Sequence, residues 1–167
     1  TRQFWLMSGV FFCQYFALQV ILVHLVPHIT DQGISAMIAA SALTAIGATS
    51  LAGRMMAGGL ADRFSSKKSL LLCISLLSAS LLWLLIAREM WMFYFFAAVF
   101  GLGYGGIYTL SSPMVAELFG LRSHGVMMGV ITFAGTVGGA IGPALAGYIF
   151  DISSSYQMAF LVTTILS

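Results

Sequence analysis

Charged side chains occur in short clusters along this chain, and long apolar stretches separate the clusters. No Asp, Glu, Lys or Arg occurs within residues 32–53, 69–87, 90–116 or 125–150, and these stretches are about 19 to 27 residues long. As a helix, such a stretch reaches about 28 to 40 Å, enough to cross a hydrocarbon core of about 30 Å. Several in succession, joined by short polar segments, predict a protein that crosses a membrane repeatedly.

The pattern predicts five complete transmembrane helices and part of a sixth. The five cover residues 5–26, 34–56, 69–87, 91–115 and 126–150, and the polar joints between them lie near residues 31–33, 62–68, 88–89 and 117–124. After a Ser-rich turn at 151–156, a last apolar run of about 11 residues reaches only about 16 Å, too short to span. We therefore expect an all-α membrane bundle from a chain that is truncated at both ends.

Composition supports this environment. The chain is 60% hydrophobic and 7% charged, whereas a soluble domain has roughly 25% charged residues, so too few polar side chains are present to form a soluble surface. The net charge of +2 is small, which argues against nucleic acid as a partner because nucleic-acid binding needs a concentrated basic face. We expect the lipid bilayer as the surroundings, in a plasma or inner membrane, and no cofactor.

The distribution of basic residues predicts the orientation. Five of them lie before the first predicted helix or in the second and fourth joints: Arg2, Arg63, Lys67, Lys68 and Arg122. The joints on the opposite side hold Asp31, the Arg88–Glu89 pair and Asp151. Because cationic residues beside membrane spans stay preferentially in the cytoplasm, we expect the amino end of the chain to be cytoplasmic.

The most specific motif lies between the second and third predicted helices, where residues 58–68 read Gly-Gly-Leu-Ala-Asp-Arg-Phe-Ser-Ser-Lys-Lys. It resembles the cytoplasmic loop signature of the major facilitator superfamily, Gly-x-Leu-x-Asp-Arg-x-Gly-Arg-Lys. The matching positions are Gly58, Leu60, Asp62, Arg63 and Lys67. Ser65 replaces the second glycine of the signature, and Ser66 replaces its first terminal base.

Other segments extend the resemblance over essentially the whole chain. Residues 117–120 with Arg122 look like the loop after a fourth or tenth helix, and residues 142–147 look like an eleventh helix. The opening, His-Leu-Val-Pro at residues 24–27, is similar to the seventh helix of the monocarboxylate and oxalate/formate branch. The resemblance implies one six-helix half, the carboxyl-terminal one, of a transporter whose other half is missing; each half is built from inverted three-helix repeats.

The function that the resemblance implies is secondary active transport of a small solute by alternating access. If the branch is right, the solute is a small organic anion, a mono- or dicarboxylate, coupled to a proton or a counter-anion. The chain is not expected to be an enzyme, because no Asp or Glu lies mid-span to pair with a nucleophile or another carboxylate. The alternative is a non-transporting sensor or assembly subunit on the same fold.

Two features have competing interpretations. The signature loop is either a latch, with Asp62 near the positive end of a neighbouring helix and the basic residues on carboxylates or lipid phosphates, or a segment that only sets orientation. Arg54 lies within the second predicted span, where an arginine is costly and often functional. Three interpretations of Arg54 are open. It takes part in an ion pair or a gate, it extends its long side chain to water at the cytoplasmic end, or it binds an anion directly.

The remaining candidates are polar residues and glycines on the predicted helices. Polar candidates for a substrate path are Gln14, Gln19, Tyr104, Tyr108, Thr132 and Thr136, each of which serves equally well in hydrogen bonds between helices. His24 and His28, one turn apart, are either water-exposed or an outer gate, and a metal site would need a third ligand that is not visible. Small residues four apart, followed by a helix-bending proline, predict close helix packing: Gly101, Gly105, Gly135, Gly139, Gly142 and Pro143.

Overall fold

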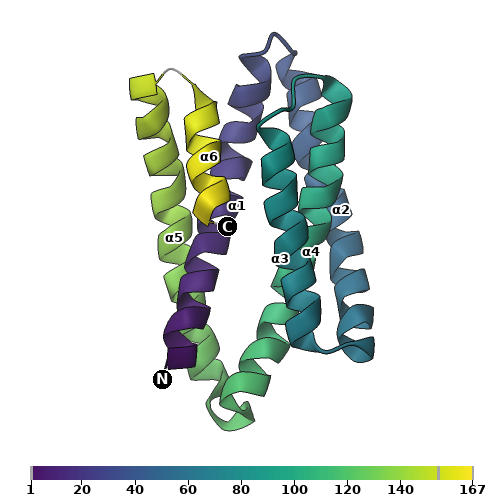
Figure 1. Ribbon diagram of the computed structural model, residues 1–167, viewed down its shortest axis with the longest axis vertical. Coiled ribbons are helices and arrows are strands. Elements are labelled where there is room, and N and C mark those ends of the chain that lie inside the picture. The colour runs from purple at the N-terminus through teal and green to yellow at the C-terminus, as the bar shows by residue number, and fades with distance from the viewer. Residues whose placement is uncertain (1, 154, 167) are drawn as a thin grey trace. The chain divides into compact units, whose positions relative to one another are not determined.

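The computed structural model describes residues 2–153 and 155–166, and helices account for nearly all of them (Figure 1). No strand occurs in this part of the chain. The elements are α1 (Arg2–Thr30), α2 (Ala36–Arg63), α3 (Ser66–Leu84), α4 (Met90–Phe119), the 3-10 turn η1 (Leu121–Ser123), α5 (His124–Ser153) and α6 (Tyr156–Leu166).

Five segments are long and apolar enough to cross a membrane: α1 to α4 and the stretch from η1 through α5. The helix α6 is apolar but has only 11 residues. The prediction of an all-α membrane protein with five spans and a shorter sixth helix is confirmed.

The predicted helix boundaries were wrong at most ends. Most helices continue into the polar joints, but α2 begins at Ala36 and α3 ends at Leu84, inside their predicted ranges. The first helix was expected to close at Pro27, yet α1 continues to Thr30. A proline at the last turn removes one hydrogen bond, and the Thr30 hydroxyl donates to the Pro27 carbonyl over 2.8 Å. The helices α4 and α5 also continue through a proline, at Pro113 and Pro143.

The signature segment differs most from its expected form. It was expected to be a loop, but residues 58–63 form the last turns of α2, and Lys67 and Lys68 lie in the first turn of α3. Hydropathy marks where a helix leaves the lipid, but the helix itself can continue beyond that point, because charged residues are compatible with helical structure in water. The helices end where the backbone changes direction, as at Gly33 (φ +83°) and Gly120 (φ +77°).

Ser65 is the corresponding break between α2 and α3. Its backbone has φ +139° and ψ +151°, a region that is essentially restricted to glycine and costs other residues about 1–3 kcal/mol. This conformation gives a physical reason for the glycine that the superfamily signature carries at this position. The serine contributes instead through its hydroxyl, which accepts a hydrogen bond from the Lys68 backbone N–H over 3.5 Å.

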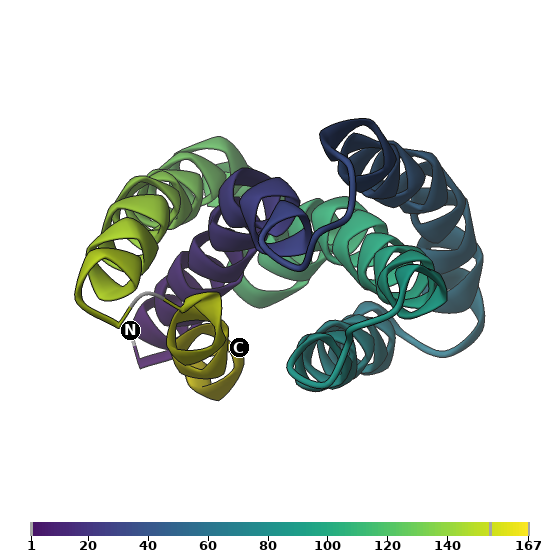
Figure 2. The same cartoon turned by 90° about the horizontal axis from the view of Figure 1, so that it is seen from above.

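The described chain divides into two compact units, residues 1–23 with 112–167 and residues 24–111. The second unit contains α2, α3 and most of α4, which lie side by side in both views (Figures 1 and 2). Gly105 of α4 lies against the Ser50 carbonyl of α2, and Gly103 lies against Cys73 of α3. The Thr49 hydroxyl of α2 also donates to the Ala97 carbonyl of α4 over 3.1 Å. Glycines therefore bring α4 into backbone contact with both of its neighbours.

The first unit uses the same device with other helices. Here α5 presents Gly135, Gly138, Gly139 and Gly142 to the first part of α1. A Cβ built on Gly142 would lie 2.8 Å from the Phe16 carbonyl oxygen, and one built on Gly138 would overlap the Phe12 carbonyl oxygen. The helix α6 packs against α5, with the rings of Phe150 and Tyr156 stacked 4.2 Å apart. Close approach of two backbones is the ordinary way in which helices associate in lipid.

Candidate functional site: a cation within the second span

Arg54 lies well inside the apolar part of α2. Arg63, at the end of the helix, lies nine positions later, which corresponds to about 14 Å along the axis. Its side chain is partly buried. Arg54 therefore lies about two and a half turns before the end of α2.

The Arg54 guanidinium lies over the ring of Tyr108 on α4, with its central carbon 4.8 Å from the ring centroid. This is a cation–π arrangement, which is stronger when water is excluded. Tyr104, one turn earlier on α4, meets Tyr108 edge to face at 6.5 Å. Arg54 and the two tyrosines, which the sequence analysis treated separately from it, thus form one group in the second unit.

The charge of Arg54 is not neutralised by a carboxylate within the described residues. Its Nε is buried and has no hydrogen-bond partner there. A cation at this depth is costly unless it meets an opposite charge or a polar partner, and a tyrosine ring compensates only part of that cost. The geometry therefore leaves Arg54 able to contact an anion.

The other predicted path residues lie in the first unit. Gln14 of α1 is buried, and the Gln19 side chain packs on Gly139 of α5. The Thr136 hydroxyl donates to the Thr132 carbonyl over 3.0 Å, so it is engaged within its own helix. A role of these residues in a substrate path stays a prediction.

The signature residues lie at the α2–α3 turn. Asp62, Arg63 and Lys67 are exposed, whereas Gly58 and Leu60 are partly buried on the last turns of α2. Within the described residues, the hydrogen bonds at this turn include the one from the Lys68 backbone N–H to the Ser65 hydroxyl and the one from the Phe64 backbone N–H to the Leu60 carbonyl. The latch stays a prediction.

His24 and His28 are buried, each with 9% of its surface exposed, which differs from the water-exposed interpretation. The His28 ring meets the Phe93 ring edge to face at 6.0 Å. Its Nε2 lies 3.1 Å from the amide nitrogen of Gln32, which donates when that ring nitrogen is unprotonated. The described residues contain no group of three His, Cys, Asp or Glu side chains that would suit a metal ion.

Sequence reasoning missed a contact at the joint between α4 and α5. The His124 Nε2 lies 3.1 Å from the Ser112 carbonyl oxygen, immediately before Pro113, and 3.2 Å from the Ser112 hydroxyl. The carbonyl can only accept, so this ring nitrogen carries the proton. The only available sign in the sequence was a histidine following a proline-containing helix, which does not specify the partner.

Comparison with known proteins identifies the class of this integral membrane protein. The family model of the Major Facilitator Superfamily matches residues 7–167. An uncharacterized MFS-type transporter of Bacillus subtilis (strain 168), YcxA, is 31% identical over 92% of this chain and 38% of its own length. Monocarboxylate transporter 13 of Rattus norvegicus is 28% identical over 84% of this chain and 33% of its own length.

Monocarboxylate transporter 7 of Homo sapiens is 30% identical over 82% of this chain and 27% of its own length. The chain belongs to the Major Facilitator Superfamily. It is similar to monocarboxylate transporters, as the resemblance of its opening segment predicted. It spans about a third of the length of these curated relatives.

Proposed function

We propose that this chain is the carboxyl-terminal half of a secondary active transporter that moves a small mono- or dicarboxylate by alternating access. Membership of the superfamily and relatives named as transporters support transport rather than catalysis. The other half of the polypeptide would supply the second wall of the solute path. A proton or a counter-anion couples the movement.

The observation that carries the anionic substrate is the uncompensated charge of Arg54. Its guanidinium is held over the Tyr108 ring, and its buried Nε has no hydrogen-bond partner among the described residues. A carboxylate entering the path would supply the missing negative charge and accept two N–H bonds from the guanidinium. Binding then recovers part of the cost of keeping a cation inside the membrane.

The moving parts of this proposal are the two ends of the bundle. The signature turn at the end of α2 acts as a cytoplasmic latch through Asp62, Arg63 and Lys67. His24 and His28, near the other end of α1, act as an outer gate whose packing is disturbed when the helices move. The burial of both imidazoles and the packing of the His28 ring against Phe93 support this role, because a shift of α1 would disturb these contacts.

The amino end of the chain is cytoplasmic in this proposal, since the basic residues of the α2–α3 turn and Arg122 then also lie in the cytoplasm. An impermeant maleimide should label Gln32→Cys in intact cells and Ser65→Cys only after the cells are opened. The native Cys13 and Cys73 lie within α1 and α3. Comparison with a variant that lacks both cysteines gives the background labelling. Labelling of Ser65→Cys in intact cells would show that the orientation is the reverse of the proposed one.

Uptake by liposomes tests the substrate class. The whole protein, purified and reconstituted, should take up radiolabelled lactate, pyruvate or oxalate with saturable kinetics, and unlabelled carboxylate should compete. A zwitterionic amino acid of similar size is the matched control. Binding of a carboxylate without any flux, under imposed proton and counter-anion gradients, would instead favour the non-transporting sensor. Absence of both would reject a carboxylate as the ligand.

A further inference from the structure

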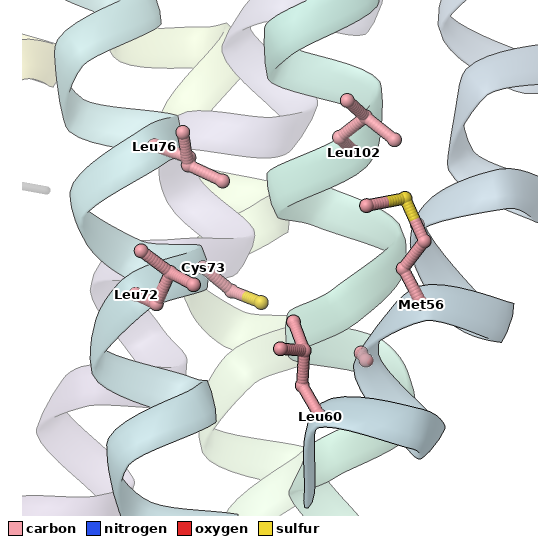
Figure 3. Close-up of a pocket in the computed structure, with 8 residues that line it drawn as sticks. Met56, Leu60, Leu72, Cys73, Leu76 and Leu102 are labelled. Atoms are coloured by element: carbon pink, nitrogen blue, oxygen red, sulfur yellow. The ribbon is translucent and has the colours of Figure 1, made fainter. Parts of the chain in front are cut away.

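A hollow lined by apolar residues lies within the second unit, among α2, α3 and α4 (Figure 3). Its volume is about 50 Å³. The side chains labelled around it are Met56, Leu60, Leu72, Cys73, Leu76 and Leu102. One water needs about 10–15 Å³ and two to four polar partners, so this hollow is large enough for water but is lined by the wrong chemistry. An apolar occupant suits it better.

A second hollow of about 240 Å³ lies between α2 and α3, toward the turn that joins them. It shares Leu60 and Leu72 with the first, so the two are neighbours, and Phe64 also lines it. We call the two hollows together the α2–α3 groove. Leu72 and Phe64 are 48% and 62% exposed, so the groove is open along its side.

Two residues with hydrophilic side chains also border the second hollow. Lys68 and Ser69, both in the first turn of α3, line it together with the three apolar residues. Ser69 is only 3% exposed, and its Oγ has no hydrogen-bond partner within the described residues. The positive end of the α3 dipole adds to the charge of Lys68, since α3 begins at Ser66.

An apolar groove that ends at a buried hydroxyl, a lysine and a helix N-terminus matches the chemistry of one ligand class. A free phosphate would leave the groove empty, and an uncharged alkyl chain would leave Ser69 and Lys68 without partners. A phospholipid supplies both parts, a chain for the apolar walls and a phosphate for the polar end. Basic pockets between transmembrane helices recognise anionic headgroups in this way.

We propose that the α2–α3 groove is a binding site for one anionic phospholipid of the adjoining leaflet. The acyl chain lies along Leu60 and Leu72 toward Cys73, and the phosphate accepts hydrogen bonds from the Lys68 ammonium and the Ser69 hydroxyl. The site does not use Arg54 or the solute path. It places a lipid against the signature turn, so the lipid composition of the membrane influences that turn.

Native mass spectrometry of the whole protein, released from detergent micelles that contain phosphatidylglycerol and phosphatidylcholine with identical chains, tests the site. We expect the wild type to retain one phosphatidylglycerol in preference to phosphatidylcholine. Lys68→Gln should weaken this binding about fivefold, the effect of about one charge near an anionic headgroup. Leu72→Trp should abolish it by filling the groove.

Each variant has a matched control one residue away on α3. Lys67→Gln removes the same charge from a residue that does not line the groove, and Leu71→Trp adds the same bulk at a position that is 55% exposed and outside it. Both should retain the lipid. Because Lys68 is exposed, Lys68→Gln should fold normally. It therefore tests the proposal even if Leu72→Trp does not fold.

Four results would overturn the proposal. Equal weakening by Lys67→Gln and Lys68→Gln would indicate general attraction between charges and no defined site. Equal retention of the two lipids would exclude an anionic headgroup site. Displacement of the lipid by millimolar glycerol phosphate would mean that the acyl chain contributes nothing. A wild type that retains neither lipid would mean that another segment of the polypeptide covers the groove.

Discussion

Replacing Gly138 by leucine should leave almost no folded protein, and Gly138→Ala should lower the free energy of unfolding by about 1–3 kcal/mol, as overpacking does. A Cβ at this position overlaps the Phe12 carbonyl oxygen and lies 3.1 Å from the Phe12 Cα. These are backbone atoms of α1, so no rotamer change relieves the overlap, and the two helices have to separate. In lipid that separation removes the close packing that holds them together.

Gly129 of the same helix is the matched control, because a Cβ built there meets nothing within 4 Å. Gly129→Ala should leave the melting temperature unchanged or raise it, since alanine favours a helix over glycine by about 1 kcal/mol. Thermal unfolding of the detergent-purified whole protein, followed by size-exclusion chromatography, measures both variants. Equal melting temperatures for Gly138→Ala and Gly129→Ala would contradict the backbone contact between α1 and α5.

Arg54→Gln should reduce carboxylate uptake at least about 30-fold, because loss of one partner of a buried charge pair costs about 2–5 kcal/mol. Arg54→Lys keeps the charge but not the planar pair of N–H donors, so we expect an intermediate loss. Arg122→Gln is the matched control, since Arg122 is exposed at η1, and its uptake should stay near that of the wild type.

Binding measured in detergent separates two of the three interpretations that the sequence left open for Arg54, contact with the solute and a role in a gate. If the guanidinium contacts the solute, Arg54→Gln loses equilibrium binding of the carboxylate together with flux. If it serves only a gate, binding survives while flux falls, and the anion-contact proposal fails. Tyr108→Phe keeps the ring beneath the guanidinium and should bind nearly normally, whereas Tyr108→Leu loses a contact worth about 0.5–2 kcal/mol.

Fold class was predictable because membrane insertion imposes a strong and local requirement. Every span needs about 20 apolar residues, and the absence of charge from residues 69–87 or 125–150 is visible without any knowledge of packing. The superfamily was predictable for a similar reason, since the signature at residues 58–68 is contiguous. The ends of the helices were not predictable, because hydropathy reports the lipid boundary and not the backbone geometry at Ser65 or Gly120.

The candidate site depended on contacts between residues far apart in the sequence. Arg54 and Tyr108 lie 54 positions apart, and only the packing of α2 on α4 places the ring beneath the guanidinium. The Ser69 hydroxyl, which has no hydrogen-bond partner within the described residues, likewise becomes visible only when its surroundings are known. The sequence by itself determined the solvent, the number of spans and the family, because these follow from local composition and contiguous motifs. The tertiary structure decided which charge lacks a partner, because pairing and burial depend on which helices become neighbours.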